Sequence, residues 1–188
     1  MAGGFQLVNS QGSYDFIQKV QTYYVTDAHA TLLAQGDCVT ISGTGQSSTG
    51  ISTVDASSAG GKITGIIAGF HINYSNLYQT WLPASTAGYV YVLNDPNALY
   101  EVEIADTALA VTDIGQNVDI VATAATLSGG MATSNMKIDG STVGSGADVQ
   151  FRIVSLVVPT DGTTIGAVGN KAIVRLNEAT EAPNSTGV

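Results

Sequence analysis

The alternation of apolar and polar residues is clearest between Tyr89 and Asp106, where it predicts two β-strands. Tyr89–Leu93 is a run of aromatic and β-branched side chains, which favour a pleated, half-buried surface. The second strand, Tyr100–Ile104, alternates strictly, so one face should contact a core and the other water. The inward set is Tyr100, Val102 and Ile104, and the outward set is Glu101 and Glu103.

The linker between these strands, Asn94–Leu99, carries a turn signal. Asp95 suits the first position of a type I turn and Pro96 the second. Pro96 also lacks an N–H, so a hydrogen-bonded ladder must break there. Because the linker is longer than a tight two-residue turn, two arrangements stay open: the strands pair directly, or they diverge into different sheets.

Similar short apolar runs recur along the chain between Gly, Pro, Asn and Asp residues, and they predict further strands. These runs are 16–25, 38–41, 51–54, 62–70, 117–121, 148–158 and 171–176. In 148–158 we expect Val149, Phe151 and Ile153 to face inward and Gln150 and Arg152 outward. Gly65 and Gly69 indicate bends or close backbone approach, and Asp139-Gly140 indicates a hairpin turn.

The remaining segments predict little regular structure. Only 27–35 suggests a helical turn, and 42–61, 126–135 and 160–169 are small-residue loops, the first of them with a brief strand. We therefore expect an all-β fold, a compact β-barrel or β-sandwich of short antiparallel strands with long Gly/Ser/Thr loops. Residues 1–20 would form an extended N-terminal arm, 21–178 one β domain, and 179–188 a flexible tail.

Charge is scarce in this chain and is mostly negative. Charged residues are 11% of the 188, against roughly a quarter in a typical domain, and the net charge is −9. Lys62 and Lys137 bracket a long stretch that has no Lys or Arg. A nucleic-acid partner needs a basic face, and an anionic membrane attracts one, so we expect neither partner.

Residue types that carry catalysis or bind metals are few and scattered. Cys38 is the single cysteine and should be a small buried hydrophobe in a strand. His29 and His71 lack the spacing of a zinc site. Glu101 and Glu103 suit a solvated strand face. The pairs Asp113 with Asp119 and Asp139 with Asp148 are weak candidates for Ca²⁺ ligands. We expect no enzyme, no cofactor and no metal.

Two groups of aromatic residues lie outside the predicted strands and are candidate contact residues. Phe5, Tyr14 and Phe16 lie in the N-terminal segment, which either tucks its aromatics onto the domain or docks as an arm on a partner subunit. Tyr74, Tyr78 and Trp81 lie in the segment 71–82, which either covers one end of a barrel or is a surface excursion that binds something.

The order of several weak motifs resembles that of the capsid decoration (cement) proteins of tailed bacteriophages. A Gly-aromatic arm is followed by a YYV strand, apolar-Gly-Asp-x-Val ending at Val39, and the strand KITGIIAGF. Then come Asn94-Asp95-Pro96 with EVEIAD, DIGQNVDIV, Ser128-Gly129, FRIVSLVV and IVRLNE. The resemblance spans most of residues 1–178, although Cys38 and the alanine-rich stretch 122–125 match no part of the pattern.

The resemblance implies a non-enzymatic virion protein, made in the host cytoplasm, on the outer capsid surface. It would bridge neighbouring major capsid proteins, often as a homotrimer, and stabilise the shell. The contact residues expected on this basis are Phe5, Tyr14 and Phe16 first, then Tyr74, Tyr78 and Trp81. The alternative is a fibre or surface-adhesion module that recognises a host glycan or protein. Exposed loop aromatics in a shallow groove would favour that alternative, and aromatics buried in the core would favour the structural role.

Overall fold

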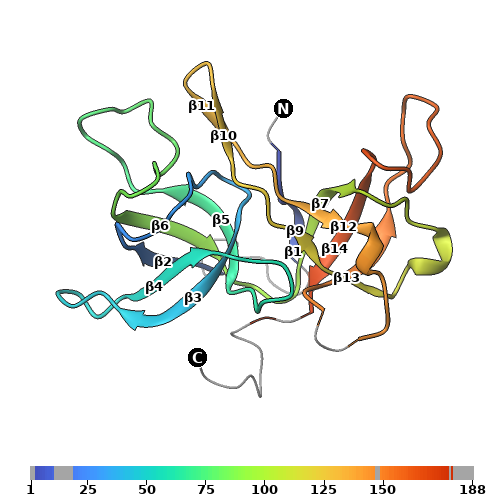
Figure 1. Ribbon diagram of the computed structural model, residues 1–188, viewed down its shortest axis with the longest axis horizontal. Coiled ribbons are helices and arrows are strands. Elements are labelled where there is room, and N and C mark those ends of the chain that lie inside the picture. The colour runs from blue at the N-terminus through green and yellow to red at the C-terminus, as the bar shows by residue number, and fades with distance from the viewer. Residues whose placement is uncertain (1–2, 11–18, 147–148, 178, 180–188) are drawn as a thin grey trace.

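The computed structural model describes residues 3–10, 19–146, 149–177 and 179, and these residues form an all-β fold (Figure 1). The all-β prediction is confirmed. The strands are β1 (Gln6–Ser10), β2 (Val20–Val25), β3 (Cys38–Gly45), β4 (Ser52–Ala56), β5 (Gly65–Phe70), β6 (Gly88–Leu93), β7 (Ala98–Ala105), β8 (Asn117–Val118), β9 (Ile120–Val121), β10 (Thr126–Ser128), β11 (Met131–Thr133), β12 (Lys137–Asp139), β13 (Phe151–Leu156) and β14 (Lys171–Leu176). The helical elements that lie wholly within the described residues are two single 3₁₀ turns, η2 (Val111–Asp113) and η3 (Gly140–Thr142).

The first half of the chain closes into a small barrel in the order β2-β4-β3-β5-β6. The antiparallel register of β2 with β6 runs from Val20 opposite Leu93 to Val25 opposite Gly88. The barrel interior is filled by alternate, mostly β-branched residues, as expected for strands with one buried face. This core cluster contains Tyr23, Val25, Leu33, Val39, Val54, Ile67, Leu82, Val90 and Val92.

The second half forms a seven-stranded sheet in the order β8-β13-β14-β7-β12-β9, with β1 also pairing along β7. Most pairs are antiparallel, but β12 runs parallel to β7, and in the barrel β2 runs parallel to β4. On β7, Tyr100, Val102 and Ile104 are buried while Glu101 and Glu103 are partly exposed. The alternation predicted for this strand is therefore confirmed.

The linker from Asn94 to Asn97 takes the chain out of the barrel and into the second sheet. Of the two arrangements left open, the strands diverge: β6 belongs to the barrel and β7 to the seven-stranded sheet. Asp95 forms the turn, since its side chain accepts from the Asn97 N–H and its carbonyl from the Ala98 N–H. Its buried carboxylate also pairs with Lys19 just before β2.

Glycine permits one close approach that the sequence had indicated. A Cβ on Gly65 would lie 2.3 Å from the Leu93 carbonyl oxygen, so only glycine lets β5 lie this close to the end of β6. At Gly69 the pairing of β5 with β6 shifts register. The predicted close approach is therefore present at Gly65, and Gly69 lies at an irregularity of the strand pairing.

Four local predictions are wrong. Residues 27–35 form turns and one bridge between Leu33 and Leu82 instead of a helical turn. The loop 126–135 contains the hairpin β10–β11, whose Gly129-Gly130 turn takes positive φ at both residues. Asp139-Gly140 is no hairpin turn, because Asp139 caps η3 through the Ser141 N–H. Gln150 is fully buried, and Val149 is only half-buried.

Gln150 is buried because its amide hydrogen bonds tie the two halves of the molecule together. Its Oε1 accepts from the Ile120 N–H at 2.9 Å, and its Nε2 donates to the carbonyls of Ser58 and Gly61. A buried amide with three partners costs little, whereas an unpaired one would be expensive. Strand alternation alone places Gln150 outside, but these distant carbonyls make its burial favourable.

Candidate functional site

Residues 71–87, between β5 and β6, form a loop that projects from the barrel at the upper left of Figure 1. Its exposed apolar side chains are Ile72, Tyr74, Leu77 and Tyr78. Tyr74 is 81% exposed and Tyr78 is 89% exposed, whereas Trp81 is half-buried. The segment is therefore mainly a surface excursion, and the prediction that its aromatics cover a barrel end is wrong for both tyrosines.

The loop is held in one shape by hydrogen bonds that its own residues make. Asn73 donates through Nδ2 to Gln79 Oε1 at 3.1 Å, and Gln79 Nε2 donates to the Trp81 carbonyl at 3.1 Å. At the base, the His71 N–H donates to the Tyr89 carbonyl, and Leu82 exchanges two backbone hydrogen bonds with Leu33. A loop ordered before binding loses less entropy when a partner arrives.

A groove of about 370 Å³ lies between the base of this loop and the outer wall of the barrel. Rings from four elements line it: Tyr24 from β2, Phe70 from β5, Tyr89 from β6, and His71 and Trp81 from the loop. Tyr24 and Tyr89 point outward because Tyr23 and Val90, their neighbours in sequence, fill the barrel interior. A cleft that combines aromatic walls with a few polar groups is the usual composition of a ligand site.

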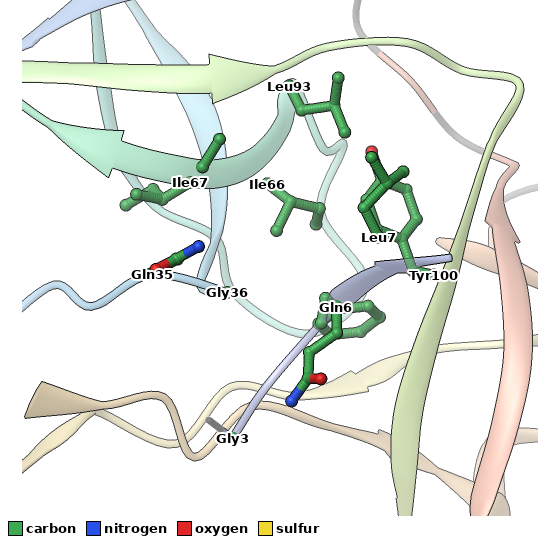
Figure 2. A pocket seen from close by; sticks show the side chains of 11 residues that line it. Gly3, Gln6, Leu7, Gln35, Gly36, Ile66, Ile67, Leu93 and Tyr100 are labelled. Atoms are coloured by element: carbon green, nitrogen blue, oxygen red, sulfur yellow. The ribbon is translucent and has the colours of Figure 1, made fainter. Parts of the chain in front are cut away.

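A second and larger hollow, of about 460 Å³, lies where the barrel meets the seven-stranded sheet. Figure 2 shows Ile66, Ile67 and Leu93 on the barrel side and Leu7 and Tyr100 on the sheet side. The Tyr100 hydroxyl is buried and has no hydrogen-bond partner among the described residues. Burial raises the pKa of Tyr100, so the hydroxyl stays neutral. The oxygen itself is enclosed, and this hollow is a largely apolar seam whose polar side chains include Gln6 and Gln35.

The N-terminal aromatic Phe5 does not lie on the surface. Its side chain is 3% exposed and stacks on Phe151 with ring centroids 4.6 Å apart. Tyr100 meets it edge-on at 6.4 Å. A ring buried in its own chain's core has no face to offer a partner, so Phe5 is corrected from contact residue to core residue. The other two residues of that prediction, Tyr14 and Phe16, lie outside the described residues.

The titratable groups that the sequence singled out are mostly structural. Cys38 is fully buried on β3, as predicted, and burial raises the pKa of its thiol. Burial raises the pKa of Asp37 to about 6, although hydrogen bonds from Ser134 and the Ala34 N–H oppose the shift. On β7, Glu101 pairs with Lys171 and Glu103 with Lys137. Such partly exposed pairs contribute little to stability.

The candidate Ca²⁺ ligands are not brought together by the fold. In the described part of the chain, no three His, Cys, Asp or Glu side chains are grouped closely enough to hold a metal ion. Asp139 and Asp113 each cap a 3₁₀ turn instead, and Asp148 lies outside the described residues. In the same part of the chain, no helix has the length and apolar character to cross a bilayer.

The sequence named Tyr74, Tyr78 and Trp81 but missed the wall against which this loop packs. Tyr24 and Tyr89 were assigned to strands, and nothing in the local pattern showed that their outward faces would meet His71. The available signal was the alternation itself, which places Tyr24 outside once Tyr23 is inside.

Comparisons of the chain with protein families, with curated proteins and with solved structures find no match.

Proposed function

We propose that this chain is a structural virion protein that binds the outer surface of a phage capsid and stabilises it by bridging major capsid proteins. The order of motifs that resembles capsid decoration proteins supports this role. The exposure of Tyr74 and Tyr78 on its own fits the alternative, a fibre or surface-adhesion module. The observation that carries the proposal is instead that exposed apolar side chains extend over three segments that project to one side of the molecule.

The three segments are the loop 71–87, the hairpin β10–β11 and the connection 157–170 between β13 and β14. All three extend toward the top of Figure 1. The exposed apolar residues that they carry are Ile72, Tyr74, Leu77, Tyr78, Leu127, Met131, Val158 and Val168. We refer to this set as the loop face.

The loop face has the composition of a protein contact surface. Exposed apolar groups concentrated in one region mark interaction sites, and tyrosine and methionine are enriched where proteins meet. A decoration protein that binds only the expanded shell stabilises that shell by mass action. Many copies, each bridging a joint, need complementary surface and no catalysis, and a homotrimer would multiply the contacts of each bound unit.

The test is sedimentation of the purified protein with empty, expanded heads of a phage whose genome encodes this chain. We expect co-sedimentation at a fixed ratio to the capsid subunit and a higher melting temperature of the heads. Replacing both Tyr74 and Tyr78 with Ala should lower affinity more than tenfold, since buried tyrosines dominate many interfaces.

The matched control is Val111→Ala, because Val111 is 61% exposed but lies in η2, outside the loop face. This control should bind like the wild type. A protein that stays in the supernatant, or a control that loses as much affinity as the double variant, would contradict the proposal.

A further inference from the structure

A continuous row of aromatic rings runs along the outside of the barrel and up into the loop 71–87. Tyr24 lies 5.2 Å from Tyr89, Tyr89 lies 6.2 Å from His71, and His71 lies 6.4 Å from Tyr74, measured between ring centroids. These separations are typical of aromatic pairs in contact. Unlike the rings of a core, all four are at least partly exposed. Neighbouring rings are tilted by 60°, 64° and 72°, so the row presents ring faces and ring edges in turn to one extended ligand.

The groove beside this row has mainly aromatic and apolar walls, and its polar side chains carry no formal charge. Its described lining residues include Asn73, Gln79, Thr86 and His71, and none is Lys, Arg, Asp or Glu. Each amide already makes contacts within the loop, yet each amide nitrogen keeps a second N–H and each oxygen a second lone pair. Such a groove can donate and accept hydrogen bonds but cannot neutralise a carboxylate or phosphate.

We propose that this groove binds a neutral oligosaccharide. A pyranose ring has an apolar C–H face and a polar rim of hydroxyls. The C–H groups are attracted to the negative faces of aromatic rings, here Tyr24, Tyr89 and Trp81. The hydroxyls match the spare donors and acceptors of Asn73 and Gln79. A lipid would leave those polar groups unpaired. A nucleic acid would find no Lys or Arg in this groove, in a chain of net charge −9.

The site is already formed in the free protein. Tyr24 and Tyr89 are fixed opposite each other on adjacent strands of a closed barrel. The loop is anchored beside them by the hydrogen bond from the His71 N–H to the Tyr89 carbonyl. A preformed aromatic wall reduces the ordering cost that makes sugar binding weak.

Trp81 provides a direct measurement, because it is the single tryptophan of the chain and lines the groove. The experiment titrates the intact protein with maltohexaose, cellohexaose and chitohexaose while recording tryptophan emission. Hexagalacturonate, of equal length but charged, is the matched ligand control. We expect a saturable emission change with at least one neutral hexaose at a Kd of about 1 mM or tighter, and at least tenfold weaker binding of the uronate.

Substitutions of the tyrosines that line the groove test whether the sugar binds there. Two single variants, Tyr89→Ala and Tyr24→Ala, should each lower the affinity for the neutral sugar about threefold to tenfold. This is the range expected for loss of one aromatic partner. Tyr91→Ala is the matched control, because Tyr91 is also half-buried on β6 but does not line the groove. Circular dichroism melts establish that each variant is folded, and two independent positions keep the test valid if one fails to fold.

The inference is overturned if folded wild-type protein responds to no neutral hexaose, or if the uronate binds equally well. It is also overturned if Tyr24→Ala and Tyr89→Ala bind like the wild type, or if a polyproline peptide produces the emission change in place of every sugar. The site is separable from capsid binding: Tyr78→Ala should leave sugar binding unchanged, because Tyr78 does not line the groove. Failure of either proposal therefore leaves the other standing.

Discussion

Phe5 and Tyr78 are both aromatic residues outside the predicted strands, but the fold places them in opposite environments. Phe5 follows two glycines and Tyr78 lies among Asn, Ser and Gln. Phe5 is 3% exposed in the core cluster that also contains Tyr100 and Phe151, and Tyr78 is 89% exposed at the loop face. The local sequence around an aromatic residue therefore does not establish whether it packs inside or projects into solvent.

The glycines before Phe5 explain its burial. A Cβ on Gly3 would lie 2.2 Å from the Ser134 carbonyl oxygen, and one on Gly4 would lie 2.2 Å from Ser134 Oγ. The segment thus packs tightly against the chain near β12, and Phe5 donates its N–H to the Gly36 carbonyl at 3.0 Å. In the loop 71–82, by contrast, side-chain amides set the shape and leave both tyrosines outside. Glycine here permits close packing, whereas composition alone suggested a free arm.

The largest expected effect is at Phe5. Phe5→Ala removes the ring that stacks on Phe151 and should destabilise the fold by about 3–5 kcal/mol, the usual cost of emptying a buried aromatic site. Urea unfolding followed by tryptophan fluorescence measures it. This expectation follows from the correction of Phe5 from contact residue to core residue. A loss below about 1 kcal/mol would mean that Phe5 is not a core residue.

The next effect concerns Asp37, adjacent to the carbonyl that receives Phe5. Because burial raises its pKa from 3.8 to about 6, the folded state holds its proton more tightly than the unfolded state. Its contribution to stability is complete below about pH 4 and is lost as pH rises through about 6. Between pH 4 and pH 7, the free energy of unfolding of Asp37→Asn should therefore rise relative to that of the wild type by up to about 3 kcal/mol.

This prediction is checked by urea unfolding of both proteins across that pH range. Asp27→Asn is the control, since Asp27 is exposed, and its difference from the wild type should stay constant. A difference between Asp37→Asn and the wild type that does not grow with pH would contradict the prediction.

A smaller loss is expected at Gly4. Gly4→Ala places a Cβ against Ser134 in a backbone with φ of 74°, which should cost about 1–3 kcal/mol from crowding. In Gly45→Ala the new Cβ would have its nearest neighbours at 3.7 Å, an ordinary contact. Thermal melts of the two variants compare them directly. Equal melting temperatures would indicate that the N-terminal segment is not packed tightly at this point.

The smallest effect on stability is expected at Tyr78, the exposed residue of the two that are compared. Tyr78→Ala removes a ring that is 89% exposed, so the free energy of unfolding should change by less than about 0.5 kcal/mol. Capsid-head binding by the same variant should weaken. A clear loss of stability would place Tyr78 in the packed structure and would weaken its assignment to a contact surface.

The sequence by itself determined the all-β class and most of the long strands. Alternation on β7 and β13 follows from the two-residue repeat of a strand, so burial of Tyr100 and Phe151 was predictable from neighbours within a few residues. The sharp turn at Asp95-Pro96 was predictable for the same reason, because turn geometry depends on the residues that form it.

Only the tertiary structure decided how distant segments meet. Phe5 is buried because β1 pairs with β7, almost a hundred residues away in the chain, and Gln150 because its amide reaches the carbonyls of Ser58 and Gly61. The groove likewise exists because closure of the barrel places Tyr24 and Tyr89 side by side under the loop. Local patterns encode which residues of a strand share a face. Contacts between segments that are remote in the sequence decide which strand faces pack against each other. These contacts also determine which buried polar groups gain a hydrogen-bond partner.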